Sequence, residues 1–436
     1  MSVDPAQMTI AEASVAIESG KLSPSALIES CLEQSAAVEP EVRAWAYCGG
    51  DQSRMAARLL DQNRPSGPLY GIPFGVKDII DTADMATEMG TPVFQGHRPS
   101  RDAACVSLLK EAGGVCLGKT VTTELAHFHP GKTRNPHAKS HTPGGSSSGS
   151  AAAVAACMVP VALGTQTTGS VLRPASFCGV YGYKPSFGDV NRSGVFECAT
   201  SFDTLGWFTR SVEDIEIVRR ALIRAPHQPL TPIPISQLRI GIFRGPTWAK
   251  VEPTTQQLIE SAASELSTVA ASVTDVEPGT GFDAIAQHHR TIAGYEFARA
   301  ISWERTERKH LLSPKLLEGR CEDGLQCTYE QYAAAQEALA AERVAIAHTM
   351  QDVDVLLTPT APGEACAGLA ATGDPVCNAA WTSLHLPAVS IPAFSGPKGL
   401  PIGLQLIGGY RQDSSLLAAA ETVRAALKIG PIRAPF

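Results

Sequence analysis

Two loops rich in glycine and serine hold the residues best suited to chemistry. They are residues 143–150 (PGGSSSGS) and residues 164–174 (GTQTTGSVLRP). Glycine adopts backbone conformations that other residues resist, so such loops let several N–H groups converge on one ligand atom. A serine among converging N–H donors can attack a carbonyl carbon while the donors stabilise the oxyanion. If Ser170 is that nucleophile, the chemistry is acyl transfer.

Two other motifs are rejected as catalytic or binding sites. Residues 113–120 (GGVCLGKT) match the phosphate-loop pattern, which needs a strand before its first glycine and a helix opening at Lys-Thr. Here the sequence predicts a helix before Gly113 and a strand inside the motif. Residues 145–149 (GSSSG) match a nucleophile elbow centred on Ser147, but the polar residues before it do not predict the required strand. His385, which could complete such a triad, has no supporting local context.

The histidines and cysteines predict neither a metal site nor a disulfide framework. The pairs His127/His129 and His137/His141 lie on no clear helix, and spacing suggests no third ligand. The 11 cysteines are an odd number without a C-x-x-C pair, which favours reduced, mostly buried thiols. We therefore expect no metal and no cofactor.

The composition is typical of a globular protein with a large core. The 436 residues are 44% hydrophobic and 18% charged, and the formal net charge of -7 argues against an extended nucleic-acid or anionic-membrane surface. Residues 1–7 lack the features of a signal peptide, and the small apolar run 151–163 is too short to span a bilayer. We expect a cytoplasmic protein that binds neither nucleic acid nor membrane.

Alternating helical and strand-like segments indicate the fold class. Helical patterns cover residues 8–34, 42–62, 104–112, 151–157, 253–271, 329–350 and 414–427, and Ser23-Pro24 indicates a helix start. Strand-like segments cover residues 69–80, 115–117, 159–164, 238–243, 354–359, 386–391 and 400–406. This alternation predicts an α/β protein, with an α/β/α layered sandwich around a large mixed, mostly parallel sheet.

One domain over residues 1–436 is expected, with four regions. These are an N-terminal helical region (1–65), a core with the candidate residues (66–225), a helical region (226–352) and a return to the core sheet with the final helix (353–436). The proline-rich stretch 226–234 suggests the start of the third region. Whether residues 226–352 cover the substrate is left open.

Several ordered blocks resemble the amidase signature family. They are 75–78 (GVKD), 143–153 (PGGSSSGSAAA), 164–170 (GTQTTGS), 177–185 (FCGVYGYKP), 201–206 (SFDTLG), 209–214 (TRSVED) and 399–405 (GLPIGLQ). Agreement over many ordered blocks is far more specific than one short motif.

The resemblance implies a Ser-cisSer-Lys triad, with Ser170 as nucleophile, Ser146 as the bridging serine after a cis peptide bond, and Lys77 as base. A free lysine has a pKa of about 10.4, so Lys77 can accept a proton only where burial lowers that pKa. In this scheme ammonia leaves, and water then hydrolyses an acyl-Ser170 intermediate. The implied oxyanion hole consists of the N–H groups of Thr167, Thr168, Gly169 and Ser170.

The motif detail is similar to that of malonamidase-type small amidases. The triad candidates are separated by 69 and 24 residues, and the order Ser-Val-x-Arg-Pro ends the second loop. In those amidases the arginine grips a free carboxylate of the substrate, so Arg173 and Gly145 are the expected substrate contacts. A guanidinium binds a carboxylate through two hydrogen bonds. A structural salt bridge from Arg173 to Glu124 or Asp189 is an equally weighted alternative.

The second loop also departs from the commonest family form. Gln166 stands where the family has aspartate, and Thr168 stands where it has glycine. Because a β-branched residue resists φ > 0, either Thr168 keeps an ordinary φ or the loop is shaped differently.

The main hypothesis is an amidohydrolase that cleaves a linear amide of a small, carboxylate-bearing molecule to an acid and ammonia. One alternative is the glutaminase (A-type) component of a tRNA-dependent amidotransferase, which needs partner subunits. Another is a catalytically silent scaffold, motivated by Thr168. The main hypothesis has a small-molecule amide as partner and leaves a homodimer open.

Overall fold

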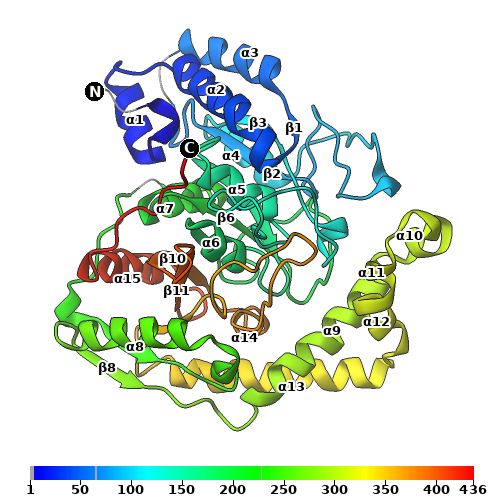
Figure 1. The fold of residues 1–436 in the computed structure, drawn as a ribbon, viewed down its shortest axis with the longest axis vertical. Helices are drawn as coiled ribbons and strands as arrows, with labels where there is room; N and C mark the ends of the chain where they lie inside the picture. Colours follow the sequence, from blue (N-terminus) through cyan, green and yellow to red (C-terminus); the bar gives the residue numbers. More distant parts are fainter. Residues whose placement is uncertain (1–3, 64–65, 227) are drawn as a thin grey trace.

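A central sheet organises the computed structural model, which describes residues 4–63, 66–226 and 228–436. Its strands are β1 (Trp45–Cys48), β2 (Pro73–Lys77), β3 (Val115–Thr120), β4 (Val161–Gln166), β5 (Tyr181–Lys184), β6 (Thr204–Thr209), β7 (Arg239–Ile242), β8 (Ser272–Asp275), β9 (Val355–Pro359), β10 (Ala388–Ser395) and β11 (Pro401–Ile407). In the described part of the chain they form one 11-stranded sheet in the order β1-β3-β2-β4-β6-β5-β10-β11-β9-β7-β8. Helices flank this sheet (Figure 1), which confirms the predicted layered α/β fold around a large mixed sheet.

Parallel pairing is concentrated in two groups. Strands β3, β2 and β4 are parallel neighbours, and so are β9, β7 and β8. The pairs from β4 across to β9 are antiparallel, and β1 pairs antiparallel with β3 at the sheet edge. A short connection such as the one between β10 and β11 permits only an antiparallel pair, whereas parallel neighbours need a crossover. Short apolar runs in a sequence do not predict whether two neighbouring strands are parallel or antiparallel.

Each predicted helical segment contains a helix, and further helices occur where none was predicted. They are α1 (Ile10–Glu18), α2 (Pro24–Val42), α3 (Gly50–Asp61), α4 (Ala104–Glu111), α5 (Ser148–Ala155), α6 (Leu172–Cys178), α7 (Val212–Leu222), α8 (Pro253–Ser267), α9 (Ile285–Ala300), α10 (Ser302–Glu307), α11 (Pro314–Leu316), α12 (Glu322–Gln326), α13 (Tyr329–Thr349), α14 (Ala379–Ser383) and α15 (Asp413–Ala426). Within the described ranges, no helix is both long and apolar enough to cross a bilayer.

The stretch 8–34 is two helices separated at Gly20, and α2 begins after Ser23, whose hydroxyl accepts the Ala26 N–H, which confirms the helix start predicted at Ser23-Pro24. The helical prediction for the stretch 42–62 was wrong at its start. The stretch 42–62 opens with β1 and not with a helix, because Arg43 ends α2 in the left-handed conformation (φ 55°). Trp45 is then buried as β1 pairs with β3.

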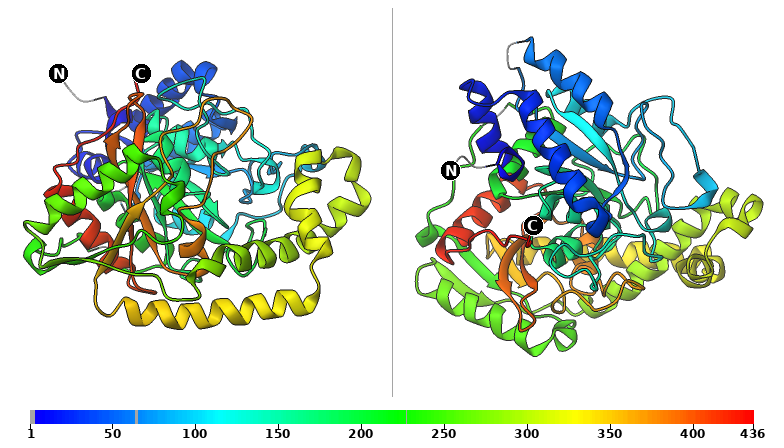
Figure 2. Two further views of the ribbon diagram at one scale, coloured as in Figure 1. Left: turned by 60° about the horizontal axis from the view of Figure 1, so that its bottom comes forward. Right: turned by 45° about the horizontal axis from the view of Figure 1, so that its top comes forward.

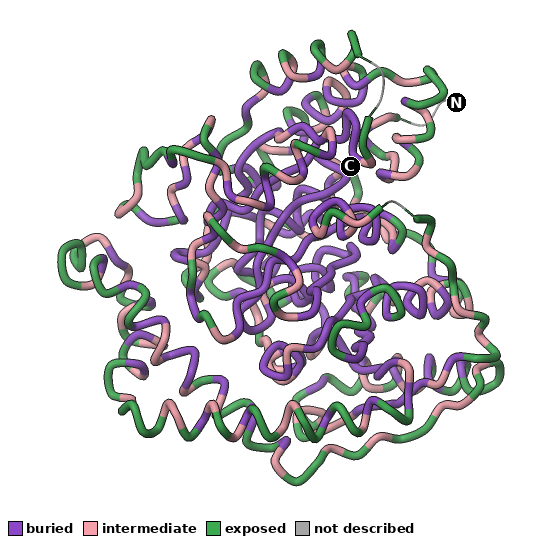
Figure 3. The backbone as a smooth tube through the Cα atoms, turned by 180° about the vertical axis from the view of Figure 1, so that it is seen from behind, coloured by how far each residue is buried: buried purple, intermediate pink, exposed green. Residues whose placement is uncertain are grey.

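A helical arm, defined here as residues 285–349, extends from one side of the molecule (Figures 1 and 2). Helix α9 packs against α12, α13 and α14. Burial is concentrated in the sheet and its covering helices, whereas much of α13 is exposed (Figure 3). The predicted helical region 226–352 also contributes β7 and β8 to the sheet. The predicted boundaries at 65 and in 226–234 include residues outside the described ranges, namely 64–65 and 227.

The sheet topology brings the two serine loops and Lys77 together. Strands β2 and β4 are parallel neighbours, so their carboxyl ends lie at the same sheet edge. Lys77 is the last residue of β2, and the second serine loop follows β4. The first loop leads directly into α5 and the second into α6.

We expect Gly149→Ala to destabilise the fold because Gly149 lies against backbone. A Cβ there would be 2.3 Å from Ala44 O and 2.4 Å from Val121 N. Overpacking of this kind costs about 1–3 kcal/mol, which calorimetry would detect as a lower Tm. The control Gly279→Ala adds a Cβ with no atom within 4 Å and should leave the Tm unchanged. Equal Tm values for the two variants would contradict the close packing of the first loop.

Candidate active site

Lys77 is fully buried and faces hydroxyl groups. Its Nζ lies 2.7 Å from Ser146 Oγ and 2.8 Å from Thr165 Oγ1. Burial lowers the pKa of Lys77 to about 7, although the negative potential of Cys198 and Asp203 opposes the shift. The adjacent carboxylate of Asp78 pairs with Lys119 at 3.0 Å. A substantial fraction of Lys77 is therefore neutral at neutral pH and able to accept a proton.

The first serine loop presents Ser146 and uses Ser147 as a structural tie. The peptide bond between Gly145 and Ser146 is cis. The buried Ser147 hydroxyl donates to Thr165 O and accepts from Thr165 N, each at 3.2 Å. Ser147 is thus occupied in joining the two loops, in agreement with its rejection as an elbow nucleophile.

The second serine loop lines one pocket together with Ser146. Thr167, Thr168, Gly169 and Ser170 all contribute to this pocket, and Ser170 is partly exposed. Neither Thr168 nor Gly169 is among the described residues with positive φ. Thr168 therefore keeps an ordinary backbone conformation, the first of the two alternatives considered for it.

Gln166 secures the start of α6. Its Oε1 accepts hydrogen bonds from Val171 N (2.9 Å) and Leu172 N (3.0 Å). Its Nε2 donates to Thr382 Oγ1 of α14 at 3.0 Å. An aspartate could accept the two N–H bonds but has no amide to donate the third. The departure at position 166 thus adds a tie between the second loop and α14.

Arg173 is a buried cation without a carboxylate partner. It is 2% exposed, and its Nη2 donates to Gly145 O at 2.6 Å and to Thr372 Oγ1 at 3.2 Å. Its Nε and Nη1 have no hydrogen-bond partner within the described structure. Burial lowers the pKa of Arg173 to about 10, so the group is still charged at neutral pH. A buried, unpaired guanidinium is unfavourable until an anion compensates it.

The predicted alternative of a structural salt bridge for Arg173 is wrong. Both proposed partners are engaged elsewhere. Glu124 accepts hydrogen bonds from Ser313 N and Oγ. Asp189 lies 3.6 Å from Arg219.

Arg320 is a pocket residue that the sequence did not reveal. It comes from η8 (Leu317–Cys321), a π-helical turn of the arm, and its Nη2 donates to Thr168 Oγ1 at 3.2 Å. Its guanidinium lies 5.6 Å from the centre of the Phe128 ring. π-Helical turns are frequent at functional sites, but they have no sequence signature by which Arg320 could have been found.

The histidines singled out by the sequence have local structural roles or line the pocket. His127 lines it, stacks on Phe297 and has an unpartnered buried Nδ1. His137 Nε2 lies 3.0 Å from Cys178 O, and His385 Nε2 lies 2.8 Å from Ser201 O. Over the described ranges, no cluster of three or more His, Cys, Asp or Glu side chains could hold a metal ion.

The structure also shows what the residues of the phosphate-loop match and the cysteines do. Residues 115–120 form β3 as predicted, and Lys119 Nζ donates to Thr87 Oγ1 at 2.6 Å while pairing with Asp78. Lys119 is therefore not available to a nucleotide phosphate. All eleven cysteines are free.

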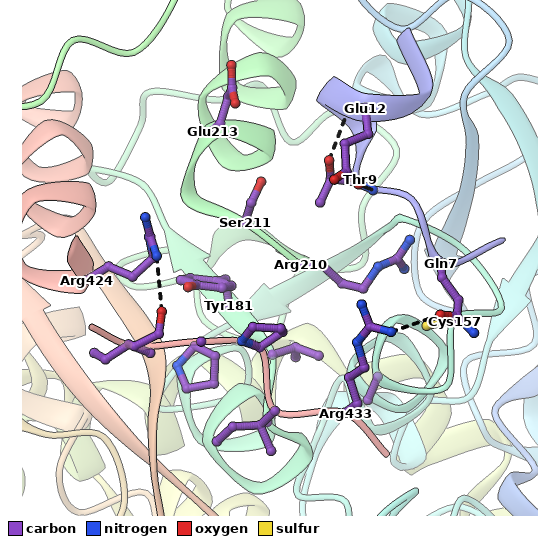
Figure 4. Close-up of a pocket in the computed structure, with 18 of the residues that line it drawn as sticks. Gln7, Thr9, Glu12, Cys157, Tyr181, Arg210, Ser211, Glu213, Arg424 and Arg433 are labelled. Carbon is purple, nitrogen blue, oxygen red and sulfur yellow. Dashed lines mark hydrogen bonds between the residues drawn. The ribbon is translucent and has the colours of Figure 1, made fainter. Parts of the chain in front are cut away.

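A larger cavity of about 650 Å³ lies elsewhere, between the N-terminal segment and the C-terminal tail (Figure 4). Its arginines are engaged to a larger extent: Arg424 pairs with Glu421, Arg433 donates to Gln7 Oε1, and Arg210 donates to the Ala6 and Val159 carbonyls, leaving only its Nε without a partner in the described structure. The smaller serine pocket is lined by the guanidinium of Arg173, with its two unpartnered nitrogens, and by Ser146, which is hydrogen-bonded to the neutralised Lys77. We therefore place the candidate active site there.

Comparisons with known proteins cover most of the chain. A family model described as Amidase matches residues 26–417. The A-type component of glutamyl-tRNA(Gln) amidotransferase from Roseiflexus castenholzii is 33% identical over 473 positions, covering 95% of this chain and 95% of the relative.

Solved structures are also similar over nearly the whole chain. Peptide amidase of Stenotrophomonas maltophilia has a TM-score of 0.84 at 29% identity and covers 99% of each chain. A structure described as a vestigial complex that reveals the evolutionary origins of an s-triazine catabolic enzyme has a TM-score of 0.89 at 27% identity, covering 98% of this chain and 100% of the other.

Proposed function

Because the chain belongs to the amidase family and is an enzyme that acts on amide C–N bonds, we propose that it hydrolyses a small amide bearing a free carboxylate. The products are a carboxylic acid and ammonia. One observation carries this proposal: the buried guanidinium of Arg173 lines the serine pocket with two nitrogens that have no partner among the described residues. Such a group is compensated best by a carboxylate that accepts two hydrogen bonds.

In the first half of the proposed reaction, Ser170 Oγ attacks the amide carbonyl carbon. Its proton passes to Ser146 Oγ, whose own proton passes to the neutral Nζ of Lys77, 2.7 Å away. The N–H groups of residues 167–170 stabilise the oxyanion. The relay then returns a proton to the amide nitrogen, the C–N bond breaks, and ammonia leaves.

In the second half, water attacks the ester carbon of acyl-Ser170. Lys77 again takes the proton through Ser146 and returns it to Ser170 Oγ as the ester bond breaks. Thr165, whose hydroxyl accepts the other Lys77 hydrogen bond, holds the amine in place throughout. Lys77 returns each proton that it accepts, so it ends each cycle neutral.

The charges of the pocket favour an anionic substrate. Arg173 and Arg320 both line it, and none of its described lining residues is aspartate or glutamate. An amide with a carboxylate at its far end places the reacting carbonyl at Ser170 and the anion at Arg173. We propose that Gly145, whose carbonyl accepts from Arg173, orients this guanidinium.

A second candidate is the glutaminase component of a tRNA-dependent amidotransferase, acting with partner subunits. The relative from Roseiflexus castenholzii favours this candidate over the first. Glutamine also combines an amide with a carboxylate, but its α-ammonium group needs an acceptor, and the described pocket lining offers no carboxylate. The alignment spans 473 positions, more than the 436 residues of this chain, so the relative carries insertions that are absent here.

An ammonia-release assay tests the proposed function. Purified protein should release ammonia from malonamate and succinamate faster than from propionamide, and Ser170→Ala should abolish release while keeping the wild-type Tm. Turnover that survives in Ser170→Ala contradicts the mechanism. A preference for glutamine, or activity that depends on co-expressed partner subunits, would instead support the second candidate.

The pH dependence tests the base. Because only neutral Lys77 accepts the proton, kcat/KM should rise with pH through an apparent pKa near 7, in line with its pKa of about 7. Activity is then lost as the pH falls below this value. A pH–rate profile with malonamate as substrate measures this apparent pKa. A value near 10 would show that Lys77 has an ordinary pKa.

Arg173→Gln tests recognition of the carboxylate. Losing charge-assisted hydrogen bonds worth about 1.5–3 kcal/mol should raise the KM for malonamate by about tenfold to hundredfold. Propionamide has the same amide and methylene groups with a methyl in place of the carboxylate and serves as the control, so its kinetics should change little. Equal losses on both amides would reject this role for Arg173.

A further inference from the structure

Thr168 is held by two side-chain contacts that a glycine at this position would lack, and by a contact to its backbone carbonyl. Its Oγ1 lies 2.9 Å from His289 Nε2 and accepts a hydrogen bond from Arg320 Nη2 at 3.2 Å. Its carbonyl accepts from Thr382 Oγ1 at 2.8 Å. The backbone of the second serine loop is therefore fixed from one side by side chains of three other elements: α9, η8 and α14.

The hydrogen-bond directions in this network follow from counting protons. Ser383 Oγ donates its one proton to Ala379 O at 2.8 Å, so it must accept from His289 Nδ1, which lies 2.9 Å away. A neutral histidine with its proton on Nδ1 has an acceptor at Nε2. The Thr168 hydroxyl therefore donates to His289 Nε2 while it accepts from Arg320.

The surroundings of His289 suit this neutral form. The side chain is buried, stacks on Phe202 at 4.4 Å between ring centres, and faces the cation of Arg320. Burial, and secondarily the charge of Arg320, lowers the pKa of His289 to about 3. A protonated ring would have no acceptor for the Thr168 hydroxyl.

We propose that His289 is a positioning residue that orients Thr168, so that the helical arm completes the oxyanion hole of the second serine loop. Rotation of the Thr168 peptide would break its side-chain and carbonyl contacts together. The N–H groups of residues 167–170 are thereby kept aimed at the position of the oxyanion. This inference rests on the proposed function, because it assigns the positioning role to the same oxyanion loop.

A double-mutant cycle between Thr168 and His289 tests the proposal. Thr168→Val keeps the shape and removes the hydroxyl, and His289→Leu keeps comparable bulk and removes the acceptor. Because oxyanion-hole donors act on the transition state, each variant should lower kcat about tenfold and slow fluorophosphonate labelling of Ser170. His289→Leu should leave the KM for malonamate unchanged, since His289 does not line the pocket.

The decisive comparison is the double variant. If His289 acts through Thr168, the double variant should be no slower than the slower single variant, whereas independent effects would multiply to about a hundredfold loss. Multiplying losses, or full kcat in His289→Leu, would overturn the proposal. Thr168→Ser restores the hydroxyl and should recover most of the lost kcat. If His289→Leu does not fold, the contrast between Thr168→Val and Thr168→Ser still decides whether the hydroxyl is needed.

His288→Ala is the matched control on α9. His288 is adjacent in sequence but makes none of the contacts to the second serine loop described above, so its kcat should equal that of the parent. Failure of the inference is distinguishable from failure of the proposed function. If Ser170→Ala is inactive while Thr168→Val and His289→Leu retain full activity, the proposed function stands and the positioning role falls.

Discussion

The complete burial of Lys77 without a charged partner is the constraint on which the site depends. The neighbouring strand shows the contrast, because Lys119 is also buried but pairs with Asp78. Asp78 adjoins Lys77 in sequence, yet its carboxylate is directed to β3, and this leaves Lys77 with only hydroxyl groups. A lysine desolvated in this way loses much of its preference for the charged form. The packing of β2, β3 and β4 thus prepares an amine base.

The pocket combines Ser146, which is hydrogen-bonded to this neutralised lysine, with two arginines that form no ion pair among the described residues. Arg173 and Arg320 both line the pocket, and they come from distant parts of the sequence. Arg173 belongs to α6, and Arg320 belongs to the helical arm. The unpaired nitrogens of Arg173 are unfavourable in the free protein, and an anionic ligand would satisfy them. The same buried charges can therefore provide specificity for a carboxylate.

The helical arm supplies side chains that contact the second serine loop, although much of α13 is exposed. It supplies Arg320 and His289, and His289 meets Thr168 across a sequence separation of 121 residues. Gln166 adds a second link, from the same serine loop to α14. The unusual residues of the second loop, Gln166 and Thr168, are thus the ones that attach it to α9, η8 and α14. Both departures from the common family form have a structural explanation in these contacts.

The sequence alone determined the features that depend on local spacing. It predicted the layered α/β fold, the helix start at Ser23, the strand within residues 113–120, and the two serine loops with Lys77. Only the tertiary structure decided the direction of strand pairing, the presence of β1, the lack of a salt bridge at Arg173, and the contributions of Arg320 and His289. The physical reason is that periodicity and motifs report neighbours along the chain. Burial, counter-charges and hydrogen-bond partners are instead set by residues that can lie more than a hundred positions apart.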